Sequence, residues 1–267
     1  MPEFRGWGGA ALVTGASSGI GLELARGLAS RGVDLVLVAR SEDKLKALSA
    51  QLATAYKVHA IPVAADLSAP DGPAVLMAQL RDVDVTLDIL VNNAGIGVYG
   101  PFANQGPARE AEMLRLNVAA PTELAAYLVP GMIRRRRGLV LNVSSTAGFA
   151  PVPWLGTYGA SKAYLVQWTH ALADELEGTG VRVAVLCPGT TATNFQSVSG
   201  AGARNRPFPQ MTAADVAKQC LRGLDKGKRV IVSGRMNAAH TFFAQLLPPS
   251  WASRIARDVN RPKRVSR

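Results

Sequence analysis

Tyr158 and Lys162 are the residues whose types and spacing indicate chemistry most directly. They stand four positions apart in Tyr158-Gly159-Ala160-Ser161-Lys162, so a helix places them on one face, about one turn apart. A phenol with an ordinary pKa of about 10 exchanges protons poorly near neutral pH. A neighbouring ammonium group favours the phenolate and lowers that pKa. The pair therefore predicts acid–base catalysis, although this spacing in isolation is usually structural.

A glycine-rich turn, Thr14 to Gly21, supplies a second chemical signal. It lies between a short apolar run and a segment with helical spacing, and its glycines follow G-x-x-x-G-x-G. Glycine lets a phosphate approach the backbone without a Cβ in the way, and a helix beginning there points N–H groups at a pyrophosphate. Such glycines can also be purely structural. The turn predicts a dinucleotide site with these candidate contacts: Gly15, Ser17, Ser18, Gly19, Ile20 and Gly21.

The end of the next apolar run bears on the choice of cofactor. An acidic residue there would bind the adenosine ribose hydroxyls, but the run ends Val38-Ala39-Arg40-Ser41, without an acid. The guanidinium of Arg40 suits a 2′-phosphate, and the hydroxyls of Ser41 and Ser17 add donors. We therefore predict NADP(H) in preference to NAD(H). In the alternative interpretation, Arg40 is an ordinary solvent-facing residue.

Alternating strands and helices are predicted to position these motifs. The strands are expected at 10–14, 33–39, 58–65, 87–91, 139–143, 181–186 and 229–232. The helices are expected at 19–31, 41–55, 70–81, 107–117, 121–136, 157–177 and 213–224. This order predicts an α/β fold of a single domain, with a doubly wound parallel sheet of about seven strands and helices on both faces. The irregular stretch 189–211 is typical of a lid.

The chain divides into residues 1–235, which hold the dinucleotide and catalytic motifs, and a basic helical extension, 236–267. We expect the extension to pack on or near the same domain. Its large apolar residues recur at roughly helical spacing, with a break at two prolines: Phe242, Phe243, Leu246, Leu247, Trp251 and Ile255. Internal packing or a subunit contact is the first interpretation. Weak contact with a membrane surface, or coverage of the pocket, is the alternative.

The charge is strongly basic: 30 Lys and Arg against 19 Asp and Glu give a net charge of +11. One basic cluster lies in residues 251–267, and a second, Arg134 to Arg137, is interpreted as a solvated helix end. No nucleic-acid motif accompanies the charge, so nucleic acid is not an expected partner. The positive field could instead attract an anionic substrate or an acidic carrier protein.

Cysteine and histidine usage excludes several classes of site. Two cysteines, Cys187 and Cys220, cannot build a disulfide scaffold or a cysteine-based zinc site. Three dispersed histidines match no zinc motif, so no metal is expected. The first residues show no secretory signal, and no apolar run reaches the roughly 18 residues of a membrane span. These features predict a cytoplasmic protein.

Taken together and in order, the motifs resemble those of the classical short-chain dehydrogenase/reductase family over about residues 8–235. Beyond the glycine turn and the Tyr-Lys pair, the matching residues are Asp66-Leu67, Asn92-Asn93-Ala94-Gly95, Asn117, Ser145, and Pro188-Gly189 with Thr193. The resemblance implies a Rossmann fold, a nicotinamide dinucleotide, and hydride transfer between it and a carbonyl or secondary alcohol. It also implies a homodimer or homotetramer.

The resemblance assigns a role to each matching residue. Tyr158 is the general acid in reduction and the base in oxidation, while Lys162 binds the nicotinamide ribose and lowers the pKa of Tyr158. Ser145, in preference to Ser144, hydrogen-bonds the substrate oxygen, and Asn117 holds a water that relays protons to Lys162. The other matches contact the cofactor: Asp66 and Leu67 at the adenine, Asn93, Ala94 and Gly95 along the riboses, and Pro188, Gly189 and Thr193 at the nicotinamide.

Structural alternatives stay open for several of these residues. Asp66 could cap the following helix, Asn117 could be a buried amide, and Pro188-Gly189 could be a plain turn. The expected substrate wall is mostly apolar, which favours a hydrophobic carbonyl compound: Ile96, Val98, Tyr99, Phe149, Val152, Trp154, Phe195 and Phe208. The leading prediction is an NADP(H)-dependent oxidoreductase. The alternatives are a 3-oxoacyl thioester reductase, a cofactor-binding protein without turnover, and a surface-binding protein that uses the basic tail.

Overall fold

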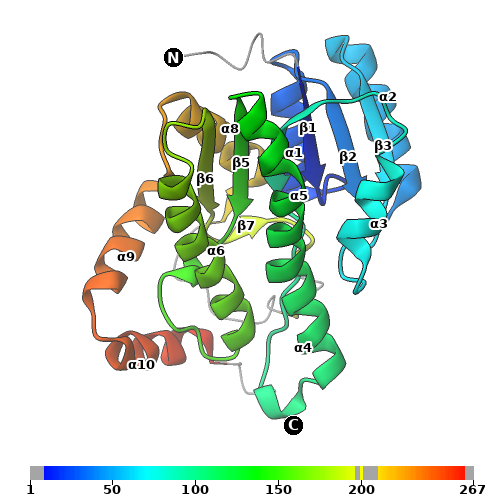
Figure 1. Cartoon of the computed structure of the whole chain (residues 1–267). Helices are drawn as coiled ribbons and strands as arrows, with labels where there is room; N and C mark the ends of the chain where they lie inside the picture. Colours follow the sequence, from blue (N-terminus) through cyan, green and yellow to red (C-terminus); the bar gives the residue numbers. More distant parts are fainter. Residues whose placement is uncertain (1–8, 196–198, 201–209, 262–267) are drawn as a thin grey trace.

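The computed structural model describes residues 9–195, 199, 200 and 210–261 (Figure 1). Seven strands form one sheet in the order β3-β2-β1-β4-β5-β6-β9, and every neighbouring pair is parallel. The strands are β1 (Ala10–Thr14), β2 (Leu35–Ala39), β3 (Ala60–Ala64), β4 (Leu87–Asn92), β5 (Gly138–Val143), β6 (Val181–Cys187) and β9 (Val230–Val232). The predicted doubly wound parallel sheet is confirmed.

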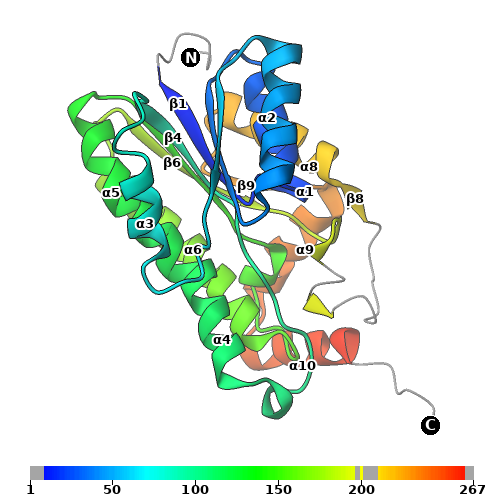
Figure 2. The ribbon, with the colours of Figure 1, turned by 90° about the vertical axis from the view of Figure 1, so that its right-hand side faces the viewer.

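Helices cover both faces of the sheet because successive strand residues point to opposite sides. Val13 and Leu37 face the layer of α1 (Gly19–Ala29), α2 (Glu42–Tyr56) and α8 (Ala213–Asp225). Leu12 and Val36 face the layer of α3 (Gly72–Gln79), α5 (Ala120–Arg134) and α6 (Gly156–Glu175). Figure 2 shows the two layers on either side of the sheet.

The strand order places a crevice at the centre of the sheet. From β1 the chain first moves to β2 and β3 on one side, and then returns to β4 on the other side of β1. The connections after β1 and β4 therefore diverge, and parallel α/β sheets bind ligands at such a switch point, outside the carboxyl ends of the strands. Both the glycine turn and the Asn93 segment lie at this point.

Two stretches differ from the sequence expectation, and a third, the C-terminal extension, follows it. The helices expected at 107–117 and 121–136 form one run, in which a π-helical turn, η2 (Arg115–Ala119), joins α4 (Pro107–Leu114) to α5. Inside the stretch predicted as a lid, β7 (Thr191–Ala192) pairs with β8 (Met211–Thr212). The extension forms α9 (Arg235–Leu246) and α10 (Pro249–Asn260), and the break lies where Pro248 keeps Leu247 extended.

The arginine run after α5 has a structural role, so its interpretation as a solvated helix end is wrong for two of its members. The carboxylate of Asp88, at the start of β4, is fully buried. One of its oxygens lies 2.9 Å from Arg135 Nε and the other 2.6 Å from Arg137 Nε. A buried carboxylate needs such partners because desolvation strongly penalises its charge.

Across the described ranges, no helix combines the length and the apolar character needed to cross a membrane. Cys187 and Cys220 are free and buried. Burial raises the pKa of each thiol to about 12, so both stay protonated at physiological pH.

Candidate active and cofactor site

A cavity of about 800 Å³ lies at the carboxyl ends of the central strands. It draws together residues of β2, β5 and α6 with residues that follow β1, β3, β4 and β6. Most of the predicted site residues line it: Gly15, Ser17, Ser18, Gly19, Ile20, Arg40, Ser41, Asp66, Leu67, Asn93, Ala94, Gly95, Ser145, Tyr158, Lys162, Pro188, Gly189 and Thr193. Two predicted residues, Gly21 and Asn117, lie outside the lining.

The glycine turn forms one wall and requires glycine for its backbone shape. Gly15 and Gly19 have φ values of +66° and +58°, in the left-handed region that side chains rarely adopt. Ser18 occupies the N-cap of α1 but makes no side-chain capping bond, and the first helical turn holds no acid. The first N–H groups of α1 are therefore available to an anion in the cavity.

Gly21 serves packing rather than ligand contact. A Cβ at this position would lie 2.3 Å from Asn93 Nδ2 and 2.5 Å from the Gly15 carbonyl oxygen. The same Asn93 amide donates to the Thr14 carbonyl, and the Thr14 hydroxyl accepts the backbone N–H groups of Asn93 and Ala94. These bonds hold the ends of β1 and β4 together at the switch point.

Arg40 and Ser41 line the cavity beyond the end of β2. No hydrogen bond or ion pair to Arg40 occurs among the described residues. Asp66 lies nearby, and its pKa is lowered, chiefly by the hydrogen bond from the Ser68 hydroxyl and to a smaller extent by the Arg40 charge. The free guanidinium, the hydroxyls and the helix N–H groups form a donor set that suits a phosphorylated anion.

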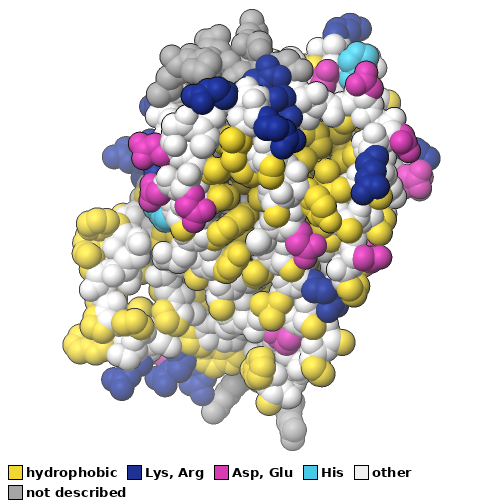
Figure 3. All heavy atoms as spheres, viewed as in Figure 1, with side chains coloured by type: hydrophobic (Ala, Val, Ile, Leu, Met, Phe, Trp, Pro, Cys, Tyr) yellow, Lys and Arg dark blue, Asp and Glu magenta, His cyan; other side chains and the backbone are white. Residues whose placement is uncertain are grey.

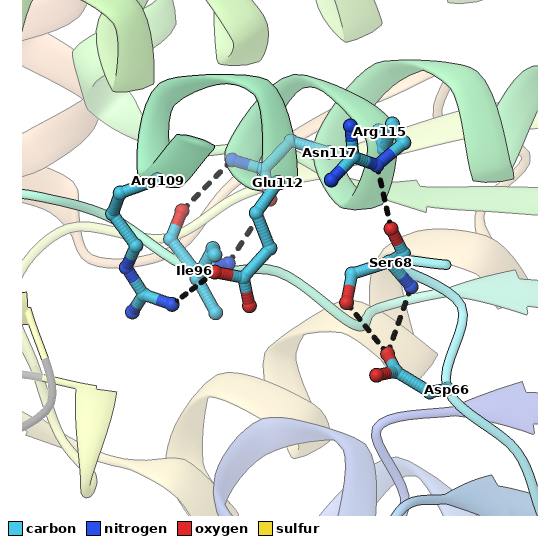
Figure 4. A network of polar contacts seen from close by, with 7 residues as sticks. All are labelled: Asp66, Ser68, Ile96, Arg109, Glu112, Arg115 and Asn117. Atoms are coloured by element: carbon cyan, nitrogen blue, oxygen red, sulfur yellow. Dashed lines mark hydrogen bonds and ion pairs between the residues drawn. The ribbon is translucent and has the colours of Figure 1, made fainter. Parts of the chain in front are cut away.

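Asp66 is held by its own loop, and it does not cap α3. One carboxylate oxygen accepts the backbone N–H and the hydroxyl of Ser68, at 2.9 and 2.6 Å. Arg115, from the π-helical turn, donates to the Ser68 carbonyl at 2.7 Å (Figure 4). The N-cap of α3 is Asp71. The loop thus fixes Asp66 at the rim of the cavity.

Tyr158 and Lys162 share the inward face of α6, as their spacing predicts. Lys162 is buried, and its ammonium donates to the Val143 carbonyl at 2.8 Å. The ammonium lies 5.8 Å from the centroid of the Tyr158 ring. Burial lowers the pKa of Lys162 to about 8, which still leaves it mostly protonated at neutral pH. A cation is thus held next to the phenol.

Ser144 and Ser145 are adjacent in sequence but face different surroundings. The Ser144 hydroxyl is buried and donates to the Lys162 carbonyl at 2.7 Å. The Ser145 hydroxyl oxygen accepts the Ala147 N–H at 3.1 Å. It lies 3.5 Å from the Pro188 carbonyl oxygen, so the hydrogen bond that it donates there is weak. The geometry therefore leaves Ser145, and not Ser144, able to donate to a ligand oxygen.

Asn117 lies behind the cavity lining and hydrogen-bonds to residues next to it. Its amide oxygen accepts the Ile96 N–H at 3.0 Å, and its amide nitrogen donates to the Ile96 carbonyl at 2.9 Å (Figure 4). The amide nitrogen also donates to the Ser161 hydroxyl at 3.0 Å. It is fully buried within the π-helical turn. The side chain links the Gly95–Ile96 loop to α6. The predicted water contact stays a prediction.

The segment after β6 closes the cavity from the other side. A Cβ at Gly19 would lie 3.1 Å from the Thr193 methyl group, so this segment reaches the glycine turn. A Cβ at Gly189 would lie 2.3 Å from Asn237 of α9. Phe195 packs on the Tyr158 ring at a centroid distance of 5.2 Å.

The apolar wall differs in part from the predicted one. Ile96, Val152 and Phe195 line the cavity. The other described members do not: Val98 and Tyr99 pack behind it, Phe149 packs against β6, and Trp154 lines a separate hollow. Phe208 lies outside the described residues. Strand periodicity does not predict side-chain directions in these loops.

The C-terminal extension supplies lining residues that the sequence analysis did not assign. From α9 and α10 these are Asn237, His240, Phe243, Ala244, Leu247, Ala252, Ile255, Ala256 and Asn260. The Tyr99 hydroxyl donates to the Asn260 carbonyl at 2.6 Å, which ties α10 to the loop after β4. The helical spacing of the apolar residues in 242–255 was the available signal, and coverage of the pocket is the alternative that this geometry matches.

Known proteins share this fold and these motifs. A model of the short chain dehydrogenase family matches residues 9–204. The ketoacyl reductase HetN of Nostoc sp. is 38% identical over 188 residues, which cover 70% of this chain and 65% of that protein. A very-long-chain 3-oxoacyl-CoA reductase of Phaeosphaeria nodorum is 40% identical over 178 residues, which cover 65% and 52%. The chain thus spans about half to two thirds of the length of these relatives.

A solved structure of a short-chain dehydrogenase is similar to this fold over nearly the whole chain. A short-chain dehydrogenase from Sphingobium yanoikuyae, in complex with NADPH, superposes with a TM-score of 0.79 at 31% identity and covers 90% of this chain and 96% of its own. The match by sequence covers the glycine turn and the Tyr-Lys pair, and the match by structure covers the sheet that positions them. The chain therefore belongs to the short-chain dehydrogenase family.

Proposed function

We propose that the chain is an NADP(H)-dependent oxidoreductase that acts on a carbonyl or secondary alcohol of a hydrophobic substrate. One observation carries the proposal: the Lys162 ammonium lies 5.8 Å from the Tyr158 ring in the cavity that also holds Ser145 and the glycine turn. The names of the relatives, a ketoacyl reductase and a 3-oxoacyl-CoA reductase, support a reaction at a carbonyl group.

In this proposal the dinucleotide supplies or accepts the hydride, while the chain's own residues handle the proton. The Tyr158 hydroxyl donates a proton to the carbonyl oxygen in reduction and removes it in oxidation. Ser145 donates a hydrogen bond to the same oxygen and stabilises its developing negative charge. The protonated Lys162, 5.8 Å from the Tyr158 ring, favours the negatively charged phenolate form of Tyr158. Asn117 is a positioning residue, which fixes the Gly95–Ile96 loop and shapes the turn beside Lys162.

The substitution Tyr158→Phe tests this reaction. It should lower turnover of a bulky hydrophobic ketone with NADPH by roughly 10²–10⁴-fold, because it removes the proton donor. NADPH affinity, followed by nicotinamide fluorescence, should stay nearly unchanged. Turnover close to that of the wild type would remove Tyr158 from the mechanism. Turnover absent from the wild type as well, despite tight NADPH binding, would favour the cofactor-binding protein without catalysis.

The preference for NADP(H) rests on Arg40, and the NADPH in the solved relative supports it. The double substitution Ala39→Asp with Arg40→Ala should weaken NADPH binding and strengthen NADH binding. The new carboxylate would accept the ribose hydroxyls and would repel a 2′-phosphate. Titration of both cofactors with both proteins measures the effect. An unchanged ratio of the two affinities would contradict the assignment of Arg40.

A 3-oxoacyl thioester reductase is the second candidate. The named relatives favour it, and a net charge of +11 suits an anionic thioester carrier. Parallel assays with a free ketone and a 3-oxoacyl-CoA distinguish the two candidates. Activity on free ketones without activity on the thioester would exclude the thioester reductase.

A further inference from the structure

The helices α9 and α10 carry a concentration of exposed apolar side chains. Among the described residues, seven of the fourteen exposed large apolar side chains belong to this pair and the turn between them. Five of them are between 57% and 66% exposed: Phe242, Phe243, Leu246, Trp251 and Ile255. We call these five side chains the α9–α10 surface. Figure 3 shows apolar side chains gathered at the lower left, over this part of the molecule.

A basic row borders the α9–α10 surface. On α10, Ala252 and Asn260 are buried toward the cavity, whereas Trp251 and Ile255, four residues apart, are exposed. Arg254 and Arg257, three residues apart, are exposed on the next face of the same helix. Figure 3 shows Lys and Arg side chains along the edge next to the apolar ones. Over residues 251–267 the net charge is +5, from six basic residues and Asp258.

The α9–α10 surface is also continuous with the cavity. Phe243 and Ile255 are exposed and line the cavity at the same time. Their outer edges face solvent and their inner edges face the pocket, so an apolar path runs from the surface of the molecule to the candidate active site. Internal packing therefore does not account for these side chains.

We propose that the α9–α10 surface docks on a membrane rich in anionic lipids. The five apolar side chains enter the boundary between headgroups and acyl chains, and Arg254 and Arg257 contact the lipid phosphates, as in other helices that lie in the plane of a bilayer. A two-fold contact centred on α10 would bring the arginines of both copies together, which disfavours a second copy there. The docking does not depend on the proposed reaction, since it is measured without cofactor or substrate.

Co-sedimentation of the full chain with vesicles tests the proposal. Vesicles of equal parts phosphatidylglycerol and phosphatidylcholine should pellet the protein at low salt, whereas pure phosphatidylcholine vesicles should leave most of it in the supernatant. High salt should release it, because salt screens the attraction. Protein that stays in the supernatant with the anionic vesicles at low salt overturns the proposal.

Charge variants separate the named arginines from the overall charge. Arg254→Glu with Arg257→Glu should reduce partitioning roughly thirtyfold or more, since each basic residue near an anionic surface contributes close to a factor of five. The matched control is Lys226→Glu with Lys228→Glu, which makes the same change of charge in the exposed turn between α8 and β9 and should lower partitioning far less. An equal loss in both variants would show a non-specific field effect and overturn the assignment.

An apolar variant distinguishes the membrane from a second copy. Phe242→Ser with Leu246→Ser and Trp251→Ser leaves the cavity lining intact and should abolish partitioning. Its sedimentation in the absence of lipid should match that of the wild type. If the wild type is an oligomer and the variant is a monomer, a second copy covers the surface, and the proposal is overturned.

Discussion

Within the candidate site, the side chains divide into those that face the cavity and those that hold them. Tyr158 and Ser145 line the cavity. Ser144 also borders it but donates its hydroxyl to the Lys162 carbonyl, and Asn117 lies outside the lining and bonds within the protein. Lys162 belongs to both groups, since it lines the cavity and donates to the Val143 carbonyl. Substitution of Ser145 should therefore affect mainly activity, whereas substitution of Ser144 should affect mainly stability.

The two serines make this separation measurable. Ser145→Ala should lower kcat for ketone reduction roughly 10²–10³-fold, as expected for the loss of a donor to a developing negative charge. Ser144→Ala should lower the free energy of unfolding by about 1 kcal/mol, through loss of its buried hydrogen bond to the Lys162 carbonyl. Steady-state kinetics and urea unfolding of both variants check the assignment. A larger kinetic loss in Ser144→Ala would reverse the roles of the two residues.

Among the elements, the junction of β4 with the end of α5 depends on one buried charge. Asp88 lies near the amino end of β4, away from the cavity at the carboxyl ends of the strands. Arg135 and Arg137, which follow α5, reach its two oxygens. Both arginines are partly exposed, so water screens part of the attraction. The contact joins the end of a helix to the start of a strand, far from any ligand.

Neutralising this carboxylate should destabilise the fold without altering the chemistry. Asp88→Asn should lower the free energy of unfolding by about 2 kcal/mol, because it weakens a charge-assisted hydrogen bond to Arg135 and removes the ion pair with Arg137. The control is Asp174→Asn at the exposed ion pair with Arg229, where a change below about 1 kcal/mol is expected. Urea unfolding measures both variants. Equal losses of unfolding free energy in the two variants would mean that burial does not strengthen the contribution of Asp88 to stability.

At the scale of the whole molecule, the cavity joins segments from both ends of the chain. One wall comes from residues between 15 and 95, in the first half of the sequence, and the outer wall comes from α9 and α10. Ala252 lines the outer wall from α10 and is almost fully buried. The small side chains of Ala252 and Ala256 thus leave space in the cavity next to α10.

Filling that room should select against large substrates. Ala252→Phe should raise KM for a bulky ketone about tenfold or more while leaving a small ketone and NADPH nearly unaffected, because the added ring occupies the substrate end of the cavity. The control is Ala214→Phe, which adds the same ring at an exposed position of α8. Steady-state kinetics with both ketones measure the effect. Equal changes for the two ketones would show that α10 does not border the bound substrate.

The sequence alone determined the fold class, and it predicted many of the residues that line the cavity. Alternation of apolar runs with helical spacing predicts a doubly wound parallel sheet, because only the periods of strands and helices are needed for that inference. The glycine turn and the Tyr158-Lys162 pair are local signals, set by backbone shape and by the helical turn, and the structure brings both to one cavity. The cytoplasmic location and the homo-oligomer stay predictions.

The tertiary structure alone decided which side chains face inward outside the regular elements. The choice between Ser144 and Ser145 as donor depends on a bond to the Lys162 carbonyl, eighteen residues away. The pairing of Asp88 with two arginines joins segments 47 residues apart. The coverage of the cavity by α9 and α10 depends on packing against Gly189 and on the Tyr99–Asn260 hydrogen bond. Local patterns do not predict such contacts, because they arise only when distant segments meet.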